Sequence, residues 1–148
     1  RKEVTIQGGD IMQQLTNAQK EALDQLLSYS WRFKRDIEIR KAELNDIPND
    51  DSNVGGGRSN VVSKQTDLII ERWDSDERLK SLEAKLEALE KTLDTLDEEL
   101  TKIFWLRWSR SSMNSWESIA ALLGYSRSAI YNKRTRILEI FADFYGFI

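Results

Sequence analysis

The clearest pattern in this 148-residue chain is a stripe of apolar residues spaced alternately three and four positions apart. It runs without interruption from Leu79 to Ile103. This spacing marks one face of an α-helix, and it also fits a heptad repeat. The pattern therefore predicts one continuous helix with an apolar seam. The seam residues are Leu79, Leu82, Leu86, Leu89, Leu93, Leu96, Leu100 and Ile103.

This seam has two interpretations. In the first, it forms a dimerising coiled coil. With Leu79 at position a, the pairs Arg78–Glu83 and Lys85–Glu90 attract each other across a parallel dimer. In the second, the seam packs as an antiparallel hairpin on the first helix of its own chain. Leucine at both seam positions specifies orientation and oligomer number poorly, so both interpretations stay open.

A second helical pattern lies nearer the N-terminus. Asp10 and Thr16 are each followed three residues later by a glutamine, so either residue can start a helix with a capping box. The residue before Pro48 is disfavoured in helical backbone, which predicts that the helix ends near residues 45–48. Between these limits the apolar residues at near-helical spacing are Leu23, Leu26, Phe33, Ile37 and Leu44.

The segment 48–63, PNDDSNVGGGRSNVVS, is dense in turn-forming residues and predicts a loop, with Ser63 as a cap for the next helix. No Gly-Lys-Ser/Thr follows the glycines, so a nucleotide-binding P-loop is excluded. One interpretation is a free linker. The other is an ordered element in which Arg58 and Asn60 contact DNA, polymerase or another subunit.

The sequence of the last third of the chain predicts two helices joined by a short turn. Residues 116–123 have a helical apolar pattern, Gly124 suits a turn with positive φ, and Ser126 is a natural N-cap for a second helix that continues through Phe141. This order predicts a helix-turn-helix domain. Its predicted core consists of Ile119, Ala120, Leu123, Gly124, Ile130 and Ile137.

Helical periodicity also orients the second helix. Ile130, Ile137, Phe141 and Phe144 share one face, which we expect to be buried. The opposite face is polar and can read bases: asparagine pairs with adenine and arginine with guanine, whereas the flanking cations and the cap serines suit phosphates. The candidate DNA-binding residues are Ser115, Ser126, Arg127, Ser128, Tyr131, Asn132, Lys133, Arg134, Thr135 and Arg136.

Charge and composition limit the function. The net charge of −3 is unevenly distributed, because residues 64–103 hold 7 Lys and Arg against 12 Asp and Glu, while residues 104–148 hold 6 against 3. This local basic surplus permits contact with DNA. The chain has no cysteine or histidine, which excludes disulfides, Cys/His zinc sites and histidine-based triads. We expect no enzyme activity, metal or cofactor. No membrane span or signal peptide is visible, so the cytoplasm is the expected location.

A resemblance to known regulators adds to this picture. The amphipathic segment 97–108 leads into the predicted helix-turn-helix, and its Leu100, Phe104, Trp105 and Trp108 are available to cover the helix pair. This order resembles the −35-binding region of bacterial sigma factors. Lys133 departs from that pattern, which usually has an apolar residue there. We expect its aliphatic stem to cover the site while its amine reaches solvent.

The loop 53–60, NVGGGRSN, extends the resemblance. A helix, this loop, a second helix and a sigma-like C-terminal domain together resemble the RinA family of phage transcriptional activators, over roughly residues 23–147. The resemblance implies a regulator of late, packaging and morphogenesis genes. It also implies promoter DNA and RNA polymerase as partners, in the cytoplasm of a Gram-positive bacterial host.

The sequence thus predicts an all-α protein. Residues 10–96, with the loop 48–63, form a helical stalk or oligomerisation region that allows a homodimer, and residues 97–148 form a helix-turn-helix DNA-binding domain. One alternative is a protein like the small subunit of phage terminases, although those generally place the DNA-binding module near the N-terminus. The other is a helical adaptor that binds protein and no DNA, its basic face being merely solvated.

Overall fold

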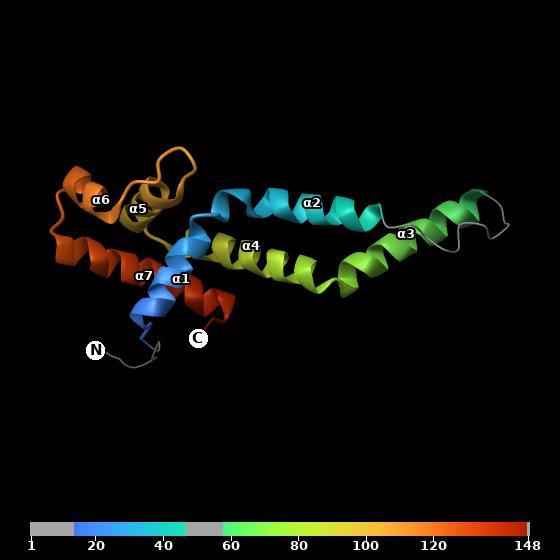
Figure 1. Cartoon of the computed structure of the whole chain (residues 1–148), viewed down its shortest axis with the longest axis horizontal. Coiled ribbons are helices and arrows are strands. Elements are labelled where there is room, and N and C mark those ends of the chain that lie inside the picture. Colours follow the sequence, from blue (N-terminus) through green and yellow to red (C-terminus); the bar gives the residue numbers. More distant parts are fainter. Residues whose placement is uncertain (1–13, 47–57, 148) are drawn as a thin grey trace. The chain divides into compact units, whose positions relative to one another are not determined.

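The computed structural model describes residues 14–46 and 58–147, with side chains from residue 64 onward in the second range (Figure 1). Every regular element in these ranges is a helix, which confirms the predicted all-α class. The helices pack into two units, which we describe separately. Among the described residues, unit 1 comprises 14–31 and 86–147, and unit 2 comprises 32–46 and 58–85. No described helix has the length and apolar character needed to cross a membrane.

Helix α1 (Asn17–Leu27) begins at one of the two starts that the sequence predicted. The Thr16 hydroxyl accepts a hydrogen bond from the backbone N–H of Gln19 at 3.1 Å, and the Thr16 N–H donates to the Gln19 side chain at 2.8 Å. This reciprocal pair is the predicted capping box, which is confirmed. The alternative start at Asp10 lies outside the described residues.

The single long helix predicted near the N-terminus is wrong. α1 ends at Leu27, a 3₁₀ turn follows at Ser30–Arg32, and α2 begins at Phe33 and ends at Asn45. At the break, the Ser28 hydroxyl donates to the carbonyl of Gln25 at 2.5 Å, in competition with the helical ladder. Ser30 is buried in the turn. The end of α2 agrees with the limit set by Pro48.

In unit 2, α2 lies beside α3 (Arg58–Ser75). The Arg40 guanidinium donates to both carboxylate oxygens of Asp76 at 2.9 and 2.7 Å. Further along, Arg72 donates to the carbonyl of Leu44 at 3.0 Å, and the Trp73 indole donates to Asn45 at 3.1 Å. As the numbering rises in α2 it falls in α3, so the two helices run antiparallel.

The start of α3 corrects the predicted loop. Residues 58–63 are helical rather than part of the loop 48–63, and Ser63 lies within α3 instead of capping it. Arg58 and Asn60 belong to the first turn of α3. Their side chains, like the glycine segment 47–57, lie outside the described part of the chain.

The continuous helix predicted for the leucine stripe is also wrong. α4 (Glu77–Thr95) and α5 (Glu98–Trp108) are separate helices. The Asp97 carboxylate accepts a hydrogen bond from the backbone N–H of Leu100 at 2.8 Å and so starts a new helix within the repeat. The boundary between the two units falls inside α4, after Lys85. The stripe residues buried within this single chain are Leu79, Leu89, Leu96, Leu100 and Ile103. The dimeric coiled coil remains a prediction.

Unit 1 also contains α6 (Trp116–Leu123) and α7 (Arg127–Tyr145). Gly124 ends α6 with φ 77°, the left-handed conformation that glycine adopts at least cost. Ser115 and Ser126 cap the two helices, each hydroxyl accepting from a backbone N–H at 3.1 Å. The helix, glycine, cap and helix expected from the sequence are all present at the expected residues.

The core of unit 1 contains most of the apolar residues predicted there. Ile119, Ala120, Ile130 and Ile137 are buried and Leu123 is half-buried. Three expectations are wrong, because Gly124, predicted to lie in the core, is exposed, and Phe144 and Trp105 are 40 % and 50 % exposed. Helix α1, assigned to the stalk in the sequence analysis, packs across α7 (Figure 1). Other large buried side chains of unit 1 include Leu23, Leu27, Phe104, Trp108, Trp116, Leu138 and Phe141.

Candidate nucleic-acid interface

The polar face of α7 lies opposite its buried face. Ser128, Asn132 and Arg136 are exposed and Thr135 is half-buried. These residues recur at helical spacing and therefore form one strip along the N-terminal half of α7. No apolar side chain belongs to this strip, so it offers hydrogen-bonding groups to a ligand.

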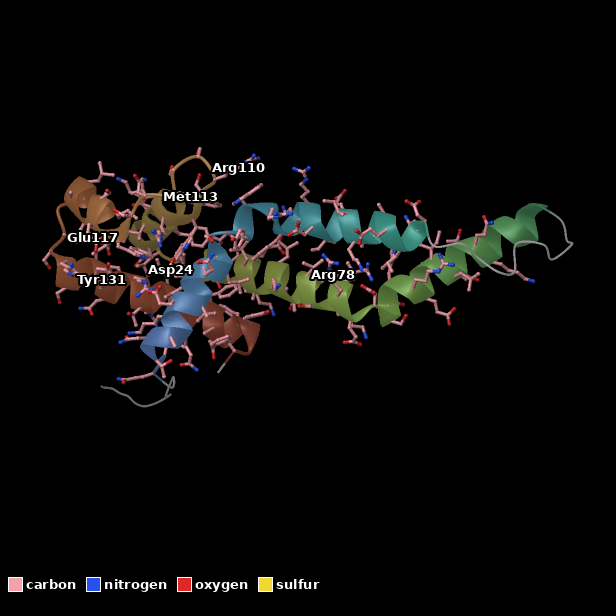
Figure 2. The ribbon with its side chains drawn as sticks, in the orientation of Figure 1. Asp24, Arg78, Arg110, Met113, Glu117 and Tyr131 are labelled. Atoms are coloured by element: carbon pink, nitrogen blue, oxygen red, sulfur yellow. The ribbon has the colours of Figure 1, made fainter. Side chains whose placement is uncertain are left out.

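A first carboxylate lies beside this strip, on α6. The hydroxyl of Tyr131 donates to Glu117 at 2.7 Å, and the Arg127 guanidinium lies 4.0 Å from the same carboxylate oxygen and 5.4 Å from the centre of the Tyr131 ring. The hydrogen bond from Tyr131 holds the pKa of Glu117 below its usual range and raises that of Tyr131. We call Glu117, Tyr131 and Arg127 the Glu117 cluster. Figure 2 labels Glu117 and Tyr131 at the α6–α7 end of unit 1.

A second carboxylate lies on α5. Glu99 accepts a hydrogen bond from the Lys133 amine at 2.7 Å and another from the Tyr125 hydroxyl. The bond to Lys133 holds the pKa of Glu99 below its usual range and raises that of Lys133. The Lys133 side chain is 34 % exposed, so its stem is partly covered while its amine is paired. We call Glu99, Tyr125 and Lys133 the Glu99 cluster.

Arg134 is not available for the phosphate contact that the sequence predicted. It is 8 % exposed, and its Nε donates to the buried Asp24 of α1 at 2.9 Å. Its Nη2 donates to Glu21 at 3.0 Å. Periodicity placed Arg134 at the flank of the buried face but did not show that α1 covers that flank. Arg134 is therefore a structural residue of unit 1.

Asp24 is the centre of a buried polar network. Its Oδ1 accepts from Arg107 at 3.0 and 3.1 Å and from the Trp108 indole at 3.0 Å, and its Oδ2 accepts from Arg134 and from the Trp116 indole at 2.9 Å each. One carboxylate thereby joins α1 to α5, α6 and α7 (Figure 2). Burial alone would raise the pKa of Asp24. The hydrogen bonds from Trp116, Arg107 and Arg134, together with the charge of Arg107, outweigh burial and lower the pKa.

The buried position of Asp24 was not predicted from the sequence, which indicates it only indirectly. Asp24 directly follows Leu23, but a charged residue beside an apolar stripe is common on an amphipathic helix, so its position alone does not indicate burial. Buried indole N–H groups need acceptors, and the chain has five tryptophans but no histidine. Those facts pointed to a buried acceptor without saying which of the acidic residues supplies it.

Fewer cations of residues 104–148 are available to a ligand than the charge count suggested. Of the six cations there, Arg107 and Arg134 pair with Asp24 inside unit 1. Lys133 is held by Glu99, and Arg110 stacks on Trp31, with 4.4 Å from guanidinium to ring centre. Arg127 and Arg136 are the exposed cations of α7. The face is thus polar with a small positive charge.

A family model described as Protein of unknown function (DUF722) matches residues 19–143. The chain belongs to this family. The matched range begins in α1 before Asp24 and ends in α7 after Arg136, so it includes both carboxylate clusters and the polar strip. No curated protein and no solved structure matches the chain significantly.

Proposed function

We propose that this protein is a sequence-specific DNA-binding transcription regulator. The observation that carries the proposal is the pair α6 and α7, joined through Gly124 and capped by Ser126, with a polar strip along the exposed N-terminal half of α7. In helix-turn-helix proteins the second helix enters the major groove, and its N-terminal residues contact base edges. The strip occupies that part of α7.

The residue types on the strip match this role. Asn132 can bond bidentately to adenine, and Arg127 or Arg136 to the O6 and N7 atoms of guanine. Ser128 and Thr135 add shorter hydrogen-bonding groups. Ser115 and Ser126 cap the N-termini of α6 and α7, and these helix starts suit phosphates, because the free backbone N–H groups of a helix start favour anions. Arg134 is left out of this set.

We propose further that the protein activates late genes of a phage by binding promoter DNA and contacting RNA polymerase. This part is supported by the resemblance of the chain to sigma factors and to the RinA family. It is tested by transcription in vitro from the promoter that the protein binds, with the host polymerase. Activation would appear as more transcript. Firm binding without any change in transcript would overturn activation and leave DNA binding intact.

Selection of bound duplexes from a random pool tests the DNA-binding proposal directly. The full chain should enrich a consensus, and fluorescence anisotropy at fixed salt then gives the affinity for the consensus and for an unrelated duplex. Asn132→Ala and Arg127→Ala should each cost about 1–3 kcal/mol of specific binding and relax the preference at one base pair.

Arg110→Ala serves as the matched control for these variants. It also removes an exposed arginine from unit 1, but from the segment before α6 instead of from α7. It should leave the consensus unchanged. Failure to enrich any sequence would contradict the proposal and favour an adaptor that binds only protein. Equal losses in all three variants would contradict the assignment of the reading face.

A further inference from the structure

The two carboxylate clusters lie on opposite flanks of the strip that we propose reads DNA. Asn132 is at the middle of the strip, and adjacent residues of an α-helix point about 100° apart. Tyr131 of the Glu117 cluster and Lys133 of the Glu99 cluster therefore lie on either side of it. The two carboxylates come from different helices, α6 and α5, yet each binds a tyrosine hydroxyl and lies beside a cation at α7.

The flanks of a helix in the major groove face the phosphates, and cations there add affinity for any sequence. Here each flanking cation already lies beside a carboxylate. Lys133 lies 2.7 Å from Glu99, and Arg127 lies 4.0 Å from Glu117. Both carboxylates remain open to solvent, with side chains 45 % and 56 % exposed, so an approaching phosphate meets their charge.

We propose that Glu99 and Glu117 determine specificity by repulsion: they weaken binding to unrelated DNA more than binding to the cognate sequence. This inference rests on the proposed DNA-binding function. Unrelated duplex offers the protein mainly phosphate contacts, which the two carboxylates oppose. The cognate duplex adds base contacts from the strip, to which Glu117 contributes by fixing Tyr131 and orienting Arg127. Specific interfaces commonly contain groups that make binding of the wrong partner unfavourable.

The test uses Glu99→Gln, Glu117→Gln and the double variant in the full chain. Glutamine keeps the size and an acceptor oxygen of glutamate and removes only the charge. Affinities for the selected duplex and an unrelated duplex are measured over a range of salt concentrations. Each single variant should bind the unrelated duplex about fivefold more tightly, and the double variant more tightly still, while affinity for the selected duplex changes less than about twofold. The salt slope on unrelated DNA should steepen by about 0.9 for each freed cation that gains a phosphate.

Asp143→Asn is the matched control, because it removes one exposed negative charge from the C-terminal end of α7. It should leave the ratio of the two affinities unchanged. An equal gain in this control, an equal gain on both duplexes, or no gain in either Gln variant would overturn the inference. The two single variants test the clusters independently, so misfolding of one leaves the other decisive.

The outcomes also separate this inference from the proposed function. If the wild-type chain binds no duplex, both fail. If the wild type binds its selected duplex and the variants keep the wild-type ratio, the DNA-binding function stands and only the role of the two carboxylates is overturned.

Discussion

Unit 1 and unit 2 each join helices through an aspartate that binds arginine, but the two aspartates have different surroundings. Asp24 is 6 % exposed, and four side chains from three other helices donate to it. Asp76 lies at a helix junction, and it binds one arginine and caps α4 through the backbone N–H of Leu79. The apolar cores differ likewise, since unit 2 buries Phe33, Ile37, Leu44 and Leu79 whereas unit 1 buries three aromatic rings together. A buried network makes every partner depend on one residue, while a peripheral pair affects only its own junction.

Asp24→Ala should give the largest effect. It removes the carboxylate that Arg107, Arg134 and the Trp108 and Trp116 indoles share in the core, although the Trp108 indole keeps the backbone carbonyl of residue 24 as an acceptor. Breaking a buried ion pair from one side costs about 3–5 kcal/mol. The free energy of unfolding, from urea denaturation followed by circular dichroism, measures this loss. Glu21→Gln is the matched control. It changes the exposed partner of the same Arg134 and should cost much less. Equal effects of the two substitutions would remove the distinction between the buried and peripheral pairs.

The contribution of Asp24 to stability should also appear as a loss of stability at acid pH. The pKa of Asp24 in the folded protein lies below its ordinary value of 3.8, so the unfolded chain binds the proton first as the pH falls. The stability that Asp24 contributes is complete above pH 3.8 and is lost as the pH falls from there through the lowered pKa. The unfolding free energy of the wild type should decline in this window. The unfolding free energy of the Asp24→Asn variant should be lower at neutral pH and should decline less steeply as the pH falls. An acid decline of the same steepness in this variant would show that other carboxylates cause it.

Gly124→Ala should have an intermediate effect, confined to unit 1. The alanine Cβ meets nothing within 4 Å, so the cost comes from the backbone angle of 77° alone and should be about 1 kcal/mol. Trp73 is the tryptophan of unit 2, and Trp73→Phe leaves fluorescence from unit 1 only. In the Trp73→Phe background, the unfolding transition followed by fluorescence should move to lower denaturant concentration when Gly124 is replaced by alanine. Stability equal to that of the parent would argue against strain at this turn.

Asp76→Asn should have the smallest and most local effect. Arg40 holds the pKa of Asp76 at about 2, so in the wild type its contribution is present above pH 3.8 and is lost as the pH falls through about 2. The variant weakens both the Arg40 pair and the cap of α4. Amide hydrogen exchange should speed up at Leu79, whose N–H donates to Asp76, and stay unchanged at amides within α6 and α7. Faster exchange throughout unit 1 would show that the junction controls more than its own helices.

Local signals predicted the parts of the structure that depend on few neighbours. Thr16, Gly124 and Ser126 start or end helices where the sequence placed them, because a cap or a positive φ is decided within about four residues. The same reasoning missed the cap at Asp97, since the leucine spacing continues across it and periodicity alone does not register a two-residue break.

At the candidate site, features that depend on long-range packing could not be predicted from the sequence. The strip of Ser128, Asn132 and Arg136 followed from helical periodicity, because an exposed face is defined by the helix itself. The burial of Arg134 did not follow. It depends on Asp24, which lies 110 positions earlier in the chain. The pairing of Lys133 with Glu99 was missed for the same reason, since it joins residues 34 positions apart.

The Asp24 network also has a consequence for the order in which the protein is built. A ribosome makes α1 long before Trp116 and Arg134, which lie 92 and 110 positions later. Contacts this distant in sequence close late and slow folding. While the chain is being synthesised, the Asp24 carboxylate is therefore hydrated, and unit 1 completes only when the last helix has emerged. A fragment that begins at Asp97 contains all four side chains that donate to this carboxylate but lacks Asp24 itself. It is expected to need α1, added as a separate peptide, before its helices pack as they do in the full chain.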